Sequence, residues 1–240
     1  MVDGLISILA IVAILLIVGL VLGLADRRNF SLVWLLIAAA LVLLNDALLT
    51  GFYGALPDFL PPSQWNWQGK LLALVASLAV ASLPLFGWTR SGLTFRQNPG
   101  SLFGAGIAFG LYCAFFLAIA LAFPNAPVTA ETLGFQLTMP GLEEELFYRG
   151  ILLLALNEAF RGRIRLLGVD WGWAAVLTSM LFGFAHAFAY SADAGFAFDP
   201  MIMALTAIPS FLAVWLRERT GSLLLPVLAH NFGNSIPILV

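Results

Sequence analysis

The sequence predicts an all-α membrane protein, a helical bundle with about eight transmembrane helices. Of the 240 residues, 61% are apolar and 10% are charged, whereas a soluble domain carries about 25% charged residues. Mean hydropathy is +0.98. Apolar runs of about 20 residues, the length that crosses a bilayer, recur along the whole chain. The first partner that the sequence predicts is therefore the lipid bilayer.

The predicted spans are the apolar runs bounded by charged residues, proline or polar clusters. We read the first run as a retained span, because it lacks a cationic leader segment and is longer than the apolar core of a signal peptide. No repeat or long linker divides the chain, so residues 1–240 are expected to form a single integral membrane domain. The spans are 4–24, 31–51, 70–88, 102–123, 139–160, 172–190, 201–216 and 222–239.

Arginines give a second, independent indication of this topology, because basic residues accumulate in cytoplasmic loops. They follow spans one, three, five and seven, and the loops between carry no basic residue apart from Lys70 at a span edge. This alternation predicts an even number of spans with both termini outside the cytoplasm. The arginines concerned are Arg27, Arg28, Arg90, Arg96, Arg161, Arg163, Arg165, Arg217 and Arg219.

Two classes of function are disfavoured by composition. The net charge of −2 provides no basic face for nucleic acid, so we expect no nucleic-acid partner. The single cysteine, Cys113, allows neither an internal disulfide nor a cysteine-based metal cluster.

Ionisable side chains inside the late spans are the strongest indication of a functional site. Each costs at least about 2.5–3.5 kcal/mol at the bilayer centre, so each needs a partner or a chemical role. Both histidines of the chain lie among them. The polar set consists of Glu143, Glu144, Glu145 and Arg149 in span five, His186 in span six, and His230 and Asn234 in span eight.

Helical spacing assigns these groups to faces. Glu145 and Arg149 are four residues apart with the acid first, which predicts a structural ion pair. Glu144 points about 100° away and is free to face a cavity. Phe182 shares a helix face with His186, so its ring can fix the imidazole, and His230 likewise shares a face with Asn234.

Four of these groups on three helices could converge into a hydrolytic site. A carboxylate and a histidine can position and deprotonate a water molecule, and a second imidazole with an amide NH₂ can donate hydrogen bonds to a developing oxyanion. These are the components that the hydrolysis of an amide bond requires. The predicted groups are Glu144, His186, His230 and Asn234.

The ordered patterns Glu144-Glu145-x-x-x-Arg149, Phe182-x-x-x-His186 and His230-x-x-x-Asn234 resemble the CAAX-protease and bacteriocin-processing (CPBP, or Abi) family of intramembrane endopeptidases, over residues 100–240. The resemblance implies an eight-span fold with a conical cavity. In it Glu144 and His186 activate water, and His230 and Asn234 stabilise the oxyanion. Glu145, Arg149 and Phe182 would support them.

The resemblance leaves metal dependence open, since the family has been described both with and without a metal. We assign no cofactor and no metal site; if zinc is used, its ligands would be Glu144, His186 and His230. Water activated by Glu144 is favoured, because Asn234 is a poor zinc ligand and a good oxyanion donor.

Two other functions compete with proteolysis. A proton-coupled transporter would spread polar residues along a path through the membrane, whereas spans one to four carry few. A nonenzymatic immunity or regulatory protein could use the same scaffold without the chemistry. The favoured reading is an endopeptidase in a bacterial or archaeal cell membrane. Its cavity would open outward, and its substrate would be a membrane-associated peptide or protein, with no assumption that the substrate is prenylated.

Overall fold

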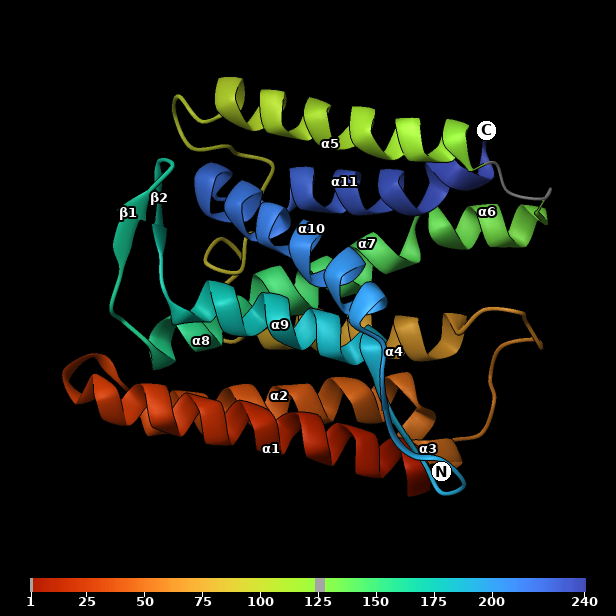
Figure 1. The fold of residues 1–240 in the computed structure, drawn as a ribbon, viewed down its shortest axis with the longest axis horizontal. Helices are drawn as coiled ribbons and strands as arrows, with labels where there is room; N and C mark the ends of the chain where they lie inside the picture. The colour runs from red at the N-terminus through yellow and green to blue at the C-terminus, as the bar shows by residue number, and fades with distance from the viewer. Residues whose placement is uncertain (1, 124–127) are drawn as a thin grey trace.

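The protein is described by a computed structural model for residues 2–123 and 128–240. Figure 1 shows most of the helices lying side by side along the longest axis of the molecule. The N-terminal half contains α1 (Val2–Ala25), η1 (Arg27–Asn29), α2 (Leu32–Leu49), α3 (Gly51–Gly54), α4 (Trp67–Ser82) and α5 (Leu102–Ala122). The C-terminal half contains α6 (Ala130–Gln136), α7 (Met139–Glu145), η2 (Leu146–Leu152), α8 (Leu153–Ala159), β1 (Ile164–Leu166), β2 (Val169–Trp171), α9 (Trp173–Ala187), β3 (Phe188–Ser191), β4 (Gly195–Phe198), α10 (Pro200–Thr220), α11 (Leu224–Ser235) and η3 (Ile236–Ile238).

The predicted all-α polytopic bundle is confirmed. Each of the eight predicted ranges contains helix. Within the described residues, four helices are long and apolar enough to cross a membrane, namely α1, α2, α5 and α10, while α4 and α9 are shorter apolar helices. The exact number of crossings therefore stays a prediction.

Two short antiparallel hairpins were not predicted. β1 pairs with β2, and β3 pairs with β4. The second hairpin begins inside the predicted sixth span, because α9 ends at Ala187 and Phe188 adopts an extended backbone. Aromatic side chains hold this hairpin together, with the rings of Phe188 and Phe196 stacked at 5.4 Å between centroids. Such cross-strand aromatic pairs stabilise antiparallel strands.

The main core packs α1 and α2 against α8 and η2. Leu15, Leu35, Ile151, Leu152 and Leu156 are all at most 1% exposed at its centre. Other large apolar side chains point outward, as expected for helices that face lipid rather than water. The core therefore anchors the helix of residues 139–159, from which the glutamates project.

This central helix contains a π-helical segment, η2, immediately after the glutamates. A π turn widens the helix and leaves its backbone groups with altered partners. The hydroxyl of Thr178 on α9 donates to the carbonyl oxygen of Tyr148 at 3.0 Å. This bond ties the widened turn to the helix that carries His186.

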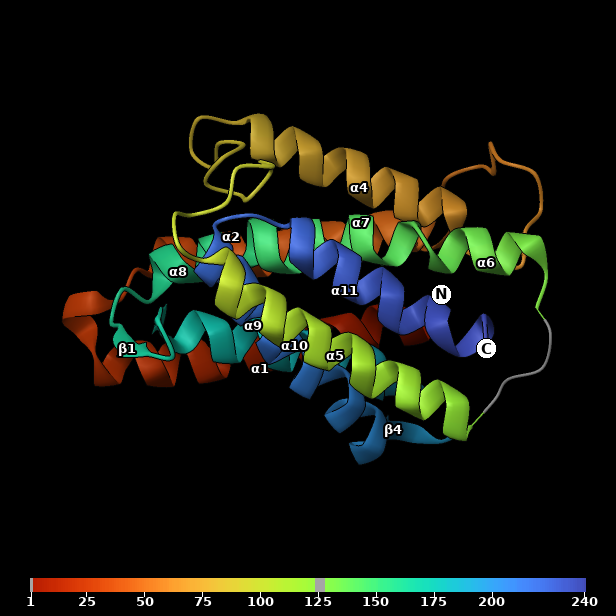
Figure 2. The ribbon, with the colours of Figure 1, turned by 90° about the horizontal axis from the view of Figure 1, so that it is seen from above.

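The arginine-bearing loops meet at one end of the bundle. The backbone NH of Arg161 donates to the carbonyl of Asn29 at 2.8 Å, and Arg217 Nη2 donates to the carbonyl of Arg90 at 2.6 Å. Figures 1 and 2 place the β1–β2 hairpin at this end and α6 at the opposite end. The loops that the charge pattern assigned to one side of the membrane thus lie together.

Candidate active site

A cavity of about 500 Å³ opens among the late helices. Its lining comes from segments far apart in the sequence, from the residues before α4 to the end of α11. The volume falls within the range of about 300–1,000 Å³ typical of ligand pockets. The four predicted catalytic residues and the three predicted supporting residues all line this cavity, whereas Glu143, the other glutamate of the polar set, does not: the lining includes Glu144, Glu145, Arg149, Phe182, His186, His230 and Asn234.

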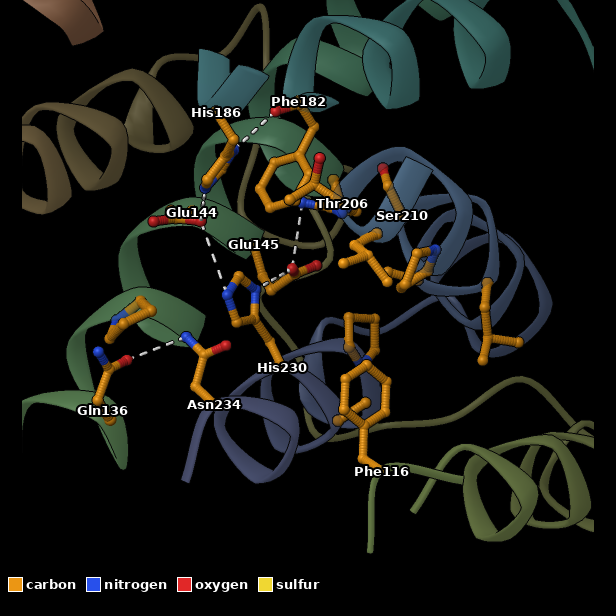
Figure 3. Close-up of a pocket in the computed structure, with 18 of the residues that line it drawn as sticks. Phe116, Gln136, Glu144, Glu145, Phe182, His186, Thr206, Ser210, His230 and Asn234 are labelled. Atoms are coloured by element: carbon orange, nitrogen blue, oxygen red, sulfur yellow. Dashed lines mark hydrogen bonds and ion pairs between the residues drawn. The ribbon is translucent and has the colours of Figure 1, made fainter. Parts of the chain in front are cut away.

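Glu144 lies between the two histidines (Figure 3). Its Oε2 atom is 4.0 Å from His186 Nε2 and 3.7 Å from His230 Nε2. These distances exceed those of direct hydrogen bonds. Oε2 is buried and has no hydrogen-bond partner among the described residues. A carboxylate oxygen in this position is available to a water molecule that bridges it to the imidazoles.

His186 is held by the backbone of its own helix. Its Nδ1 atom lies 2.8 Å from the carbonyl oxygen of Phe182, and the two rings pack with centroids 4.6 Å apart. Because a carbonyl only accepts hydrogen bonds, Nδ1 carries the proton and the neutral ring presents a lone pair at Nε2. The face shared by Phe182 and His186 was predicted, whereas the role of the Phe182 carbonyl was not.

His230 is oriented by Glu145. The Nδ1 atom of His230 lies 2.7 Å from Glu145 Oε1, so Nδ1 donates and Nε2 faces Glu144. The same carboxylate pairs with Arg149 at 3.1 Å, as the four-residue spacing predicted. The guanidinium group of Arg149 lies over the Phe182 ring at 4.2 Å. Glu145 and Arg149 together thus link all three motifs.

Asn234 faces the cavity from the same helix as His230 (Figure 3). Its Nδ2 atom donates to Gln136 Oε1 at 3.1 Å. An amide NH₂ has two hydrogens, so one N–H remains for a second acceptor. Gln136 was not predicted from the sequence, because it lies on a separate short helix with no spacing relation to the motifs.

Lys70 is the most important residue that sequence reasoning missed. Its Nζ atom lies 2.6 Å from Glu143 Oε2 and 2.5 Å from Glu144 Oε1. It is the only lysine in the sequence, and it sits at the start of an otherwise apolar span. That isolated charge was the available signal, and it was interpreted only as a span edge.

The zinc alternative does not fit this arrangement of side chains. Among the described residues, no group of three histidine, cysteine, aspartate or glutamate side chains is placed to hold a metal ion. The other carboxylate oxygen of Glu144, Oε1, accepts a hydrogen bond from the ammonium group of Lys70. A zinc site would favour a further ligand at that place, whereas Lys70 puts a second cation there. The geometry therefore provides no step that runs through a metal.

Fold and cavity together define a polytopic membrane protein with a buried site of carboxylate and imidazole groups. Residues 125–236 match the family model described as Type II CAAX prenyl endopeptidase Rce1-like. This match covers the region that carries the motifs and bears out the predicted resemblance to the CAAX-protease family there. Comparisons with curated proteins and with solved structures found no match.

Proposed function

We propose that this protein is an intramembrane endopeptidase that hydrolyses a peptide bond of a membrane-associated peptide or protein. The observation that carries the proposal is the Oε2 atom of Glu144, which has no hydrogen-bond partner among the described residues and faces two imidazole Nε2 atoms inside the cavity. The family match supports the class of reaction. The geometry supports the assignment of individual roles.

Water is activated between Glu144 and His186. A water molecule at Glu144 Oε2 donates one hydrogen to the carboxylate and the other to His186 Nε2. This nitrogen carries a lone pair, because the Phe182 carbonyl fixes the tautomer with its proton on Nδ1. Two acceptors orient the water so that its own lone pair points at the scissile carbonyl carbon. Glu144 takes the proton as the water oxygen attacks that carbon.

The oxyanion is stabilised by His230 and Asn234. Asn234 supplies the N–H that Gln136 does not use. His230 already donates from Nδ1 to Glu145, so it can donate from Nε2 only as an imidazolium. The Glu145 carboxylate stabilises that charged ring, and an oxyanion with such preorganised donors forms at lower cost.

Collapse of the tetrahedral intermediate completes the reaction. The C–N bond breaks as the C=O bond reforms, and the proton held by Glu144 passes to the departing amine. One water is consumed, and one carboxyl group and one amine are released. A single carboxylate thus serves first as base and then as acid.

The cavity wall indicates an apolar substrate segment. Besides the polar groups, the wall contains aromatic and aliphatic side chains from α5, α6 and α10, notably Tyr112, Phe116, Phe135, Leu205 and Leu212. Because α5 and α10 are candidate membrane spans, a peptide held at the bilayer can present apolar side chains to this wall. We propose no requirement for a prenyl group.

A reconstituted cleavage assay tests the proposal. Purified protein in vesicles is given a library of membrane-anchored peptides, with and without a prenyl group, and products are identified by mass spectrometry. Glu144→Gln and His186→Ala should each lower kcat by about 10²–10⁴-fold, the usual contribution of general acid–base catalysis. Glu158→Gln is the control, because this carboxylate pairs with Arg90 away from the catalytic cavity.

Each assay is repeated with a chelator. We expect activity to persist in its presence. Activity that survives Glu144→Gln would refute the mechanism, and loss with chelator followed by rescue with zinc would replace it with a metal-dependent one.

A further inference from the structure

Lys70 reaches the active carboxylates from a helix outside the family-matched region of residues 125–236. Helix α4 is capped by Asn66, whose side chain accepts a hydrogen bond from the backbone NH of Gly69 at 3.0 Å. This cap fixes the first turn, where Lys70 lies. The side chain of Lys70 is 13% exposed, and the side chain of Glu143, which its ammonium group contacts, is fully buried.

The first consequence concerns charge. Glu143 and Glu144 are consecutive residues, and both bind the same Nζ atom. Two carboxylates that share a buried site cannot both stay ionised without a nearby cation. Without one, one of the two would take up a proton. Lys70 supplies that cation at hydrogen-bond distance from both.

The second consequence concerns orientation. Lys70 binds Oε1 of Glu144, which leaves Oε2 turned toward His186 and His230. Rotation of the carboxylate would break the bond to the ammonium group. The lysine therefore determines which oxygen meets the water.

We infer that Lys70 is a positioning residue for the proposed hydrolysis: it keeps Glu144 ionised beside Glu143 and holds its Oε2 atom toward the two histidines. The inference rests on the proposed function. Nothing in the motifs of the late spans assigns this role to Lys70.

Several other charged or titratable groups surround Glu144, and none on a neighbouring helix replaces Lys70. Arg149 is paired with Glu145, and both histidines approach the other oxygen of Glu144. The groups that face this region are Lys70 on α4, Glu143 and Glu145 on α7, Tyr148 and Arg149 on η2, His186 on α9 and His230 on α11.

The test compares Lys70→Met with Lys70→Arg and a matched surface control. Lys70→Met should lower kcat at pH 7 by about 10²-fold, the low end of a lost general base, and move the acid limb of the pH–rate profile to higher pH. Lys70→Arg, which keeps the charge, should retain most activity and the original profile. Arg165→Met removes a cation from an exposed ion pair with Asp170 and should change neither.

A spectroscopic measurement gives a result that does not depend on any substrate. At pH 7 the infrared spectrum of Lys70→Met should contain a protonated carboxyl band that disappears in Lys70→Met/Glu144→Gln. The wild type minus Glu144→Gln difference should instead show an ionised carboxylate. If Lys70→Met does not fold, Lys70→Gln replaces it, since glutamine keeps a hydrogen-bond donor without the charge.

The outcomes separate the two proposals. Loss of activity in Glu144→Gln together with wild-type rate and profile in Lys70→Met would overturn the Lys70 inference alone. Full activity in Glu144→Gln would overturn the proposed function. A lower rate in Lys70→Met with an unshifted profile and no protonated band would reduce Lys70 to a packing role, contrary to the inference.

Discussion

His230 Nδ1 and Glu145 Oε1 are 2.7 Å apart, so the second glutamate of the motif orients the histidine of another helix while it also neutralises Arg149. One carboxylate therefore has two separable roles. Its bond to His230 concerns the reaction, and its bond to Arg149 concerns stability.

Glu145→Gln should impair both roles. We expect kcat to fall by about 10²-fold. The imidazolium form of His230 loses its counter-ion, so the oxyanion loses the hydrogen bond that His230 Nε2 would donate. Arg149 would be left without its partner in a buried position, at a cost of about 3–5 kcal/mol. Steady-state kinetics and thermal unfolding in detergent measure the two effects.

The double variant Glu145→Gln/Arg149→Met separates the two roles of Glu145. Replacing both partners of a buried ion pair is far less costly than removing one, so the melting temperature should recover while kcat does not. Recovery of kcat in this variant would show that Glu145 matters only for stability.

Asn234→Ala tests the oxyanion donor. Removing one such donor costs about 10²–10³-fold in kcat, and KM should stay unchanged because the interaction strengthens only in the transition state. Thr206→Val is a suitable control, since Thr206 also lines the cavity but its hydroxyl donates to its own helix at Ile202. Equal effects of the two substitutions would argue against a specific role for Asn234.

Substitution of Gly141 tests the contact between α7, which carries the glutamates, and α11, which carries His230. The backbone NH of Gly141 donates to Asn231 Oδ1 at 2.8 Å. A Cβ atom at Gly141 would overlap that oxygen and lie 2.8 Å from the carbonyl of Val227. Gly141→Ala should therefore destabilise the protein by about 1–3 kcal/mol, the usual cost of overpacking, and should lower activity by moving Glu144 away from His230.

Gly110→Ala is the matched control for this substitution. Gly110 also lies in a helix, but a Cβ atom there would meet nothing within 4 Å. Alanine is the better helix former, by about 1 kcal/mol. Thermal unfolding should therefore show no loss for Gly110→Ala, and a similar loss for both variants would contradict the packing argument.

Membrane orientation is tested by cysteine labelling in a Cys113→Ser background. The arginine-bearing loops predict that position 163 is cytoplasmic and that position 191, at the other end of the bundle, is external. A membrane-impermeant thiol reagent added to intact cells should label Ser191→Cys and not Arg163→Cys. The reverse labelling pattern would show that the cavity opens toward the cytoplasm.

Local spacing predicted the parts of the site that lie within one helix. The ion pair of Glu145 and Arg149 follows from a four-residue separation, and the contact between Phe182 and His186 follows in the same way. Such pairs are fixed by helix geometry alone.

Contacts between helices could not be predicted in this way. The bond from His230 to Glu145 joins residues 85 positions apart, and the bonds from Lys70 join residues more than 70 positions apart. Helical periodicity gives the face of each residue but not its neighbour across the bundle. The end of α9 at Ala187 was missed for a related reason, because the aromatic pairs that favour β3 depend on β4.

The position of Lys70 has a consequence for chimeras. Exchange of the first hundred residues with those of a relative would preserve every motif of the late spans and yet remove the cation that both carboxylates bind. Such a hybrid should fold, but Glu143 and Glu144 would not both stay ionised unless the exchanged segment supplies a basic side chain at the position of Lys70. Activity of the hybrid would then depend on one positive charge, and a single lysine introduced into the exchanged segment at the position of Lys70 should restore it.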